Sequence, residues 1–205
     1  MRVIDSADAA AIGAAAAAVR EGSLVVLPTD TVYGVGADPR SPRAVDRLLT
    51  AKGRGRDKPS PVLVASAAQA EELAREAPDV AKALMGEFWP GALTLVLPSE
   101  RLGWDLGETN GTIALRMPNH PLALELLEEA GPLAVSSANL SGRPPAATVG
   151  EAVEQLGGKV AVYLDGGPCP GGSPSTIVSF DGGLMRVLRE GGVGRGELAR
   201  FGDVA

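Results

Sequence analysis

The chain has 205 residues, a formal net charge of -6, 45% hydrophobic residues and one cysteine, Cys169. This length fits one domain with a sizeable core, or at most two small ones, and we expect residues 1–205 to form a single domain. The acidic total excludes proteins that bind nucleic acid over their whole surface, because such proteins carry a basic face. A lone cysteine and the absence of any run of about 18 apolar residues predict a reducing, cytoplasmic setting with no membrane span.

Helix and strand signals alternate along the chain. An Ala-rich helix capped by Asp5 or Ser6 is expected to end near Gly22, and the apolar run 24–27 follows as a strand covered on both faces. The pair Ser41-Pro42 is typical of a helix start, and Gly53 can close that helix.

Further signals predict a mixed sheet. The Gly/Pro-rich segment 166–174 is interpreted as a functional loop, since strand signals continue beyond it. The fold class is therefore α/β, a single-domain twisted mixed sheet flanked by helices. The remaining expected elements are strands at 62–65, 92–97, 112–116, 133–136 and 160–164, helices at 67–76, 78–88, 119–130 (capped by Asn119 and stopped by Gly131) and 149–156, and a hairpin of 176–180 with 184–188.

Several common enzyme signatures are missing. There is no G-x-x-x-x-G-K-[ST] element, and Pro39 stands where a dinucleotide fingerprint starting at Gly34 needs its third glycine. The single histidine, His120, lies at an expected helix start, where a capping or surface role is the simplest interpretation. Neither a histidine-dependent hydrolase nor a protein-bound metal is predicted.

Four cations occur in the seven positions from Lys52 to Lys58. They either form a solvated run that complements the C-terminal dipole of the preceding helix, or converge on phosphates, which the intervening glycines let the backbone approach. Farther along, Ser137 and Asn139 supply an uncharged hydroxyl and amide that can donate to phosphate oxygens. We expect the two runs to bind one triphosphate.

Two other segments place polar groups at the ends of buried strands. Residues 28–34 bring hydroxyls and a carboxylate directly after strand 24–27, either in a tight turn or in a ligand loop. Arg116 ends an apolar strand, where it either pairs with a structural carboxylate or binds a ligand carboxylate through two hydrogen bonds. The sequence leaves both alternatives open.

Six motifs in order resemble the YrdC-like threonylcarbamoyl-AMP synthase family, and the match covers nearly the whole chain. The resemblance implies a twisted sheet around a positively lined cavity. It also implies a nucleotidyltransferase that makes threonylcarbamoyl-AMP and pyrophosphate from ATP, L-threonine and bicarbonate, with Mg²⁺ carried by ATP, for modification of tRNA by a downstream threonylcarbamoyl transferase complex. The motifs are 28–34, 52–54, 90–94, 115–118, 136–142 and 174–176.

The resemblance also assigns site residues. Lys52 and Arg54 are the expected catalytic residues, which neutralise charge on the phosphates. The nucleotide-binding positions are Lys52, Arg54, Lys58, Thr112, Ser137, Asn139 and Arg189, and the threonine-binding positions are Thr31, Arg116, Ser136 and Ser175.

Two alternatives and one departure accompany this hypothesis. The same cavity could serve a non-catalytic RNA-binding module, which predicts salt-sensitive RNA affinity and no pyrophosphate release. A carbamoyl-transfer domain of larger maturation proteins is disfavoured, because no zinc-finger or acylphosphatase segment accompanies it. Some family members carry a histidine four residues beyond the proline of the cationic run, where this chain has Leu63.

Overall fold

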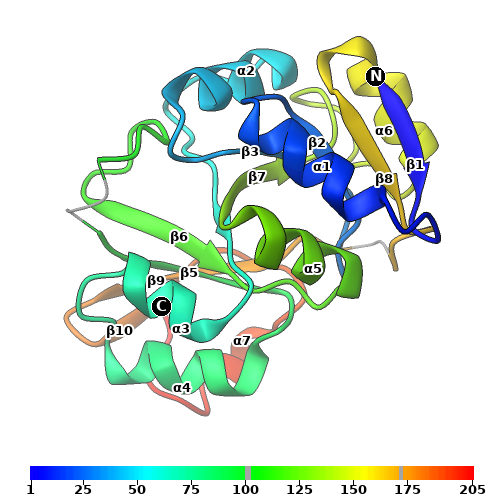
Figure 1. Cartoon of the computed structure of the whole chain (residues 1–205). Coiled ribbons are helices and arrows are strands. Elements are labelled where there is room, and N and C mark those ends of the chain that lie inside the picture. The colour runs from blue at the N-terminus through cyan, green and yellow to red at the C-terminus, as the bar shows by residue number, and fades with distance from the viewer. Residues whose placement is uncertain (100–102, 171–172) are drawn as a thin grey trace.

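The computed structural model describes residues 1–99, 103–170 and 173–205. Its helices flank a mixed sheet (Figure 1). The strands are β1 (Arg2–Asp5), β2 (Val25–Leu27), β3 (Gly34–Ala37), β4 (Val62–Leu63), β5 (Leu93–Pro98), β6 (Thr112–Arg116), β7 (Leu133–Ser137), β8 (Val162–Asp165), β9 (Thr176–Asp181) and β10 (Leu184–Arg189). The helices are α1 (Ala11–Arg20), α2 (Pro42–Lys52), α3 (Ala67–Leu73), α4 (Asp79–Phe88), α5 (Pro121–Ala130), α6 (Val149–Leu156) and α7 (Arg195–Leu198), with a 3-10 turn at Gly157–Lys159.

The sheet combines parallel and antiparallel pairs, as predicted. Its strand order is β1-β8-β2-β3-β7-β4-β6-β5-β9-β10. The short strand β4 pairs with β7 on one side and β6 on the other, and so joins the two halves of the sheet. This arrangement brings the end of β7, the end of β6 and the segment after β2 to one region of the molecule.

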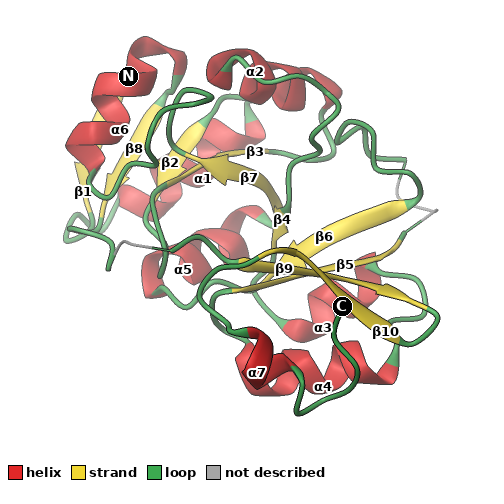
Figure 2. Ribbon diagram, turned by 180° about the vertical axis from the view of Figure 1, so that it is seen from behind, coloured by secondary structure: helices red, strands yellow, loops and turns green. Residues whose placement is uncertain are grey.

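Helices cover both faces of the sheet. Alternation along β2 sets the two layers, because Val25 and Leu27 pack with α1 and α5, whereas Leu24 and Val26 pack with α2 and α6. Figure 1 shows α1 and α5 on the near face, and Figure 2 shows α2 and α6 from behind. Two apolar core layers therefore hold the sheet between helices, as the continuous apolar strand runs predict.

The helix that carries the cationic run forms as its sequence predicts. Ser41 Oγ accepts the backbone N–H of Ala44 at the start of α2, and Pro42 occupies the first turn. At its end Gly53 adopts φ 62°, a left-handed conformation that glycine reaches without steric cost. These signals fix the position of Lys52 as the last residue of the helix.

Two predicted helix caps are wrong. Asp5 ends strand β1, which pairs in parallel with β8, and α1 begins only at Ala11 after a residue whose side chain makes no cap hydrogen bond. The N-cap position of α5 is occupied by His120, not Asn119, and the His120 side chain makes no cap hydrogen bond, whereas the backbone N–H of Asn119 donates to Asp30 Oδ1.

Other expectations are confirmed, with small shifts at the ends of elements. The hairpin of β9 and β10 turns through Gly182 and Gly183, both with positive φ. The predicted loop 166–174 lies partly outside the described residues. No helix in the described part of the chain has the length and apolarity needed to cross a bilayer.

Candidate active site

One cavity brings together the cationic run and the loop that follows β7. Its volume is about 400 Å³, and it lies between the C-terminal end of α2 and that loop. The polar/charged residues that line it include five of the seven predicted nucleotide-binding residues. These five are Lys52, Arg54, Lys58, Ser137 and Asn139.

Lys52 ties the two sides of this cavity together. Its side chain is buried, and Nζ donates to the carbonyl oxygens of Ser137 and Asn139, the latter at 2.7 Å, and to Asn139 Oδ1 at 3.4 Å. The backbone N–H of Ser141 donates back to the Lys52 carbonyl at 2.9 Å. Burial and then the charge of Arg54 lower the pKa of Lys52 to about 8. The ammonium therefore holds the wall of the cavity and leaves positive charge next to it.

Asn139 completes this wall. Its Nδ2 donates to the carbonyl oxygens of Leu140 and Arg143, each at 2.8 Å, so the amide folds residues 139–143 into a compact turn. Ser137 precedes this turn as the last residue of β7. Both N–H groups of the Asn139 amide are used within this turn, so the prediction that the amide donates to phosphate oxygens is wrong for this arrangement. The Ser137 hydroxyl has no hydrogen-bond partner among the described residues.

Arg54 extends from the cationic run toward the end of β7. Its Nη1 donates to Ser136 Oγ at 3.2 Å, and its Nε is buried without a partner among the described residues. Burial lowers the pKa of Arg54, and Asp57 opposes that effect. An N–H group without a partner at the cavity wall has hydrogen-bonding capacity to offer a ligand.

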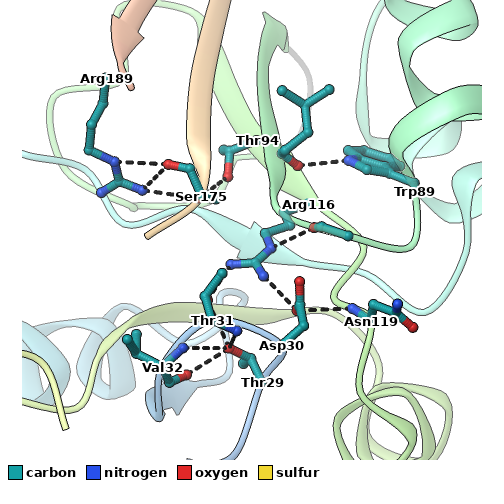
Figure 3. Close-up of polar contacts among 12 residues, drawn as sticks. Thr29, Asp30, Thr31, Val32, Trp89, Thr94, Arg116, Asn119, Ser175 and Arg189 are labelled. Carbon is teal, nitrogen blue, oxygen red and sulfur yellow. Dashed lines mark hydrogen bonds and ion pairs between the residues drawn. The ribbon is translucent and has the colours of Figure 1, made fainter. Parts of the chain in front are cut away.

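Arg116 is held by three groups at the end of β6. Nε donates to the Gly91 carbonyl at 3.0 Å, Nη1 to Thr31 Oγ1 at 3.1 Å, and Nη2 to Asp30 Oδ1 at 2.6 Å (Figure 3). The exposed fraction of the side chain is 8% for Arg116 and 15% for Asp30. Burial lowers the pKa of Arg116, and the charge of Asp30 opposes that effect. Arg116 thus has a structural carboxylate partner and also keeps unused donors.

Thr31 belongs to a fixed turn. Thr29 Oγ1 accepts the backbone N–H groups of Thr31 and Val32 and donates to the Val32 carbonyl at 2.6 Å. Thr29 Oγ1 also lies 3.0 Å from Thr31 Oγ1. The side chains of this segment bond their own backbone, which confirms the tight-turn interpretation, and Thr31 also contacts Arg116, whereas the ligand-loop interpretation stays a prediction.

Ser175 and Arg189 form a second polar group near Arg116. Arg189 donates to the Ser175 carbonyl from Nε at 3.0 Å and from Nη2 at 2.7 Å, and to Ser175 Oγ at 3.0 Å. Thr94 Oγ1 lies 2.8 Å from the same hydroxyl (Figure 3). Arg189, predicted for the nucleotide, therefore contacts a residue predicted for threonine.

Three guanidinium groups share this region. Burial lowers the pKa of Arg189, and the charges of Arg116 and Arg54 lower it further. The three positive charges repel one another, and an anion that binds among them would reduce this repulsion. Across the described ranges, no three His, Cys, Asp or Glu side chains are arranged to hold a metal ion.

One predicted site residue lines a different cavity, and two residues of the site were not predicted. Thr112 lines a separate cavity of about 330 Å³ with Trp104, and its hydroxyl donates to the Thr109 carbonyl. Leu63 pairs in register with Arg116, and its side chain belongs to the core beside α1 and α5. The prediction omits Asp30 and Thr94 as site residues, although both stand inside motifs that it uses.

A cavity of about 500 Å³ lies outside this site, between α2 and the 3-10 turn. It contains none of the predicted site residues.

Cys169 is buried, which raises its pKa and keeps the thiol protonated.

Comparison with known proteins decides the family. A sequence model of the Sua5/YciO/YrdC family, described as "Telomere recombination", matches residues 17–191. The chain belongs to this family. A Mycobacterium tuberculosis relative is 53% identical over 189 residues, which cover 92% of this chain and 87% of the relative.

Two further family members add names and a structure. Threonylcarbamoyl-AMP synthase of Bacillus subtilis is 44% identical over 190 residues, and the match covers 91% of this chain and 55% of that protein. The crystal structure of Pyrococcus abyssi Sua5 complexed with L-threonine superposes with a TM-score of 0.94 at 37% identity, covering all of this chain and 63% of that one. The chain thus spans little more than half the length of these two family members.

Proposed function

We propose that this chain is a threonylcarbamoyl-AMP synthase, an enzyme that converts L-threonine, bicarbonate and ATP into threonylcarbamoyl-AMP, pyrophosphate and water. The observation that carries the proposal is the contact between two groups of residues. A cavity lined by three cations, one carboxylate and several neutral polar groups is linked through the contact of Arg54 with Ser136 to the region of a buried arginine, Arg116, which has unused N–H groups. One group suits a triphosphate, and the other suits an amino-acid carboxylate.

Threonine and bicarbonate first form the N-carbamate, with loss of water and of one proton from the ammonium group. The adenylyl transfer that follows needs no proton transfer by the protein, because the carbamate is already an anion and one of its oxygens attacks the α-phosphorus as the bond to pyrophosphate breaks. The protein must align two anions and neutralise the charge that develops on the phosphates. Arg54 supplies fixed charge at the cavity wall, Mg²⁺ enters with ATP, and Lys52 and Asn139 hold the loop that presents the Ser137 hydroxyl.

The amino-acid side uses separate groups. Arg116 binds the threonine carboxylate with its remaining N–H groups, and Thr31, Ser136 and Ser175 surround it. Thr112 and Arg189 remain proposed nucleotide contacts. The product passes to a separate threonylcarbamoyl transferase complex that modifies tRNA, and we expect the chain to act in the cytoplasm, where ATP, threonine and tRNA meet.

An omission series tests this function. Purified protein with Mg²⁺, ATP, threonine and bicarbonate is expected to release pyrophosphate, and leaving out any one substrate is expected to abolish release. Pyrophosphate that appears without threonine would contradict the proposal. RNA binding that weakens with salt, without pyrophosphate release, would instead support the RNA-binding alternative.

Two arginines of the cationic run provide a matched comparison. Arg54 lines the cavity, whereas Arg56 forms ion pairs with Asp46 and Asp105 on the surface. Arg54→Ala is expected to lower kcat/KM by roughly a hundredfold or more, because a charge that stabilises the transition state is lost. Arg56→Ala is expected to stay within about threefold of the original activity, as exposed ion pairs contribute little. Equal losses would contradict the assignment of Arg54.

A further inference from the structure

Asp30 occupies an unusual position for a carboxylate in a site that we expect to bind anions. It lies against Arg116, with Oδ1 2.6 Å from Nη2, and the same oxygen accepts the backbone N–H of Asn119 at 3.0 Å. Two segments far apart in the sequence therefore fix this carboxylate beside the guanidinium. Figure 3 shows Asp30 between Arg116 and Asn119.

Both side chains keep hydrogen-bonding groups that the described residues do not use. Arg116 uses one N–H on each of Nε, Nη1 and Nη2, so one N–H on each Nη has no partner in the described part of the chain. Asp30 uses Oδ1 alone, and its Oδ2 accepts no hydrogen bond from the described residues. The pair thus offers two adjacent donors and one adjacent anionic acceptor.

This pairing matches a zwitterion better than an anion. Free threonine carries its carboxylate and its ammonium on the same carbon, so it can face both partners at once. A carboxylic acid without an amino group would place a second negative charge beside Asp30, with one guanidinium to share. The remaining Arg54 and Arg189 favour anions generally and do not make this distinction.

We propose that Asp30 is the specificity-determining residue that makes the amino-acid side of the site select a zwitterion. This inference rests on the proposed function and extends it, because it assigns the recognition of the substrate's ammonium group. Oδ2 of Asp30 accepts from the ammonium while the Arg116 donors bind the carboxylate. Asp30 also orients Arg116 through Oδ1.

The chain offers a matched control for the test. Asp38 Oδ1 accepts Nε of Arg40 at 2.8 Å and the backbone N–H of Arg40 at 3.0 Å, the same combination of one guanidinium and one backbone donor. Neither residue contacts the candidate site. Asp38→Asn therefore makes the same chemical change in an ion pair away from the site, at a carboxylate of similar exposure but with an arginine that is more exposed than Arg116.

The experiment measures binding of two ligands by calorimetry without ATP. They are L-threonine and 3-hydroxybutanoate, which is threonine without its amino group. The protein is expected to bind threonine at least about tenfold more tightly than the hydroxy acid, a difference of about 1.4 kcal/mol. In Asp30→Asn this ratio is expected to fall by about tenfold, with weaker threonine binding and tighter hydroxy-acid binding, whereas Asp38→Asn leaves it within about twofold.

The outcomes separate this inference from the function that it extends. If Asp30→Asn weakens both ligands by the same factor, Asp30 only positions Arg116, and the selectivity proposal is overturned. Equal affinities of the unaltered protein for both ligands overturn it too, whether or not the variant folds. If these results come with threonine-dependent pyrophosphate release, only this inference falls, whereas a protein that neither binds threonine nor releases pyrophosphate loses both.

Discussion

Arg54 Nη1 lies 3.2 Å from Ser136 Oγ, and this contact joins the cationic run to the strand end on the amino-acid side of the site. Arg189 makes a similar connection through Ser175. The two predicted sets of residues therefore meet directly, as a reaction between two bound anions requires, because proximity and alignment lower its barrier.

Arg116 is expected to control threonine more than ATP. Arg116→Lys keeps the charge but loses the planar pair of donors, so we expect KM for threonine to rise by about tenfold or more. KM for ATP is expected to change by less than about threefold, since we propose that the phosphates bind on the other side of the site. Steady-state pyrophosphate release measures both constants, and equal increases would contradict the assignment. Arg116→Ala is less informative, because it leaves the carboxylate of Asp30 without its partner, which destabilises the fold.

Nucleotide affinity is expected to depend on pH through Lys52. Its pKa is lowered to about 8, so raising the pH through this value removes the ammonium charge from the cavity wall. KM for ATP is then expected to increase above pH 8. Lys52→Arg keeps its charge over this range and is expected to show no such inflection. An unchanged inflection in that variant would assign it to another group.

The lowered pKa of Lys52 has the opposite effect on folding stability, which is expected to increase with pH while ATP binding weakens. An unfolded lysine keeps its proton up to about 10.5, whereas folded Lys52 releases it near 8, so the unfolded chain binds more protons between these values. Stability from Lys52 is therefore expected to rise as the pH increases through this window, by on the order of 1 kcal/mol per unit. Urea unfolding of the original protein and of Lys52→Met, compared at each pH, measures this effect. A difference that falls with pH would contradict it.

Gly53 ends the helix that positions Lys52, and Gly86 in α4 provides a matched control for substituting it. Gly53 has φ 62°, and a methyl group on its Cα would project into open space, so Gly53→Ala is expected to destabilise the protein by about 1 kcal/mol through backbone strain alone. Gly86 lies inside α4, also in open space, and Gly86→Ala is expected to stabilise by about 0.5–1 kcal/mol. Chemical denaturation provides both values. The same sign for both substitutions would be inconsistent with the left-handed cap.

Thr94 is expected to act by positioning Ser175. Thr94→Val keeps the shape but removes the hydroxyl that lies 2.8 Å from Ser175 Oγ. The loss of one buried hydrogen bond costs about 1 kcal/mol, so KM for threonine is expected to rise about fivefold with little change in KM for ATP. A larger effect on ATP than on threonine would place Ser175 on the nucleotide side.

Local signals account for the part of the fold that the sequence predicts. The apolar run at 24–27 and the caps of α2 depend on neighbouring residues, and both are found as expected. Strand β3 escaped prediction because it contains two glycines, which strands usually avoid. A Cβ at Gly34 would lie 2.6 Å from Val135 Cγ1, so the close approach of β3 to β7 explains that glycine, and only the tertiary structure reveals it.

The site shows the same division. The cationic run and Arg116 are conspicuous because charge is unusual next to apolar segments, and the family resemblance supplies their roles. Asp30 pairs with Arg116 across 86 residues, and Thr94 with Ser175 across 81, so no local pattern announces either partnership. Strand pairing through β4 brings these segments together in space, and their separation along the sequence does not predict this proximity.

The most direct test of the account is a crystal structure of the protein with a non-hydrolysable ATP analogue, Mg²⁺ and L-threonine. The account predicts phosphates between Arg54 and the Ser137–Asn139 loop, with the threonine carboxylate on Arg116 and its nitrogen between Asp30 Oδ2 and the α-phosphate. Phosphates bound away from this cavity, or threonine bound away from Arg116, would contradict it.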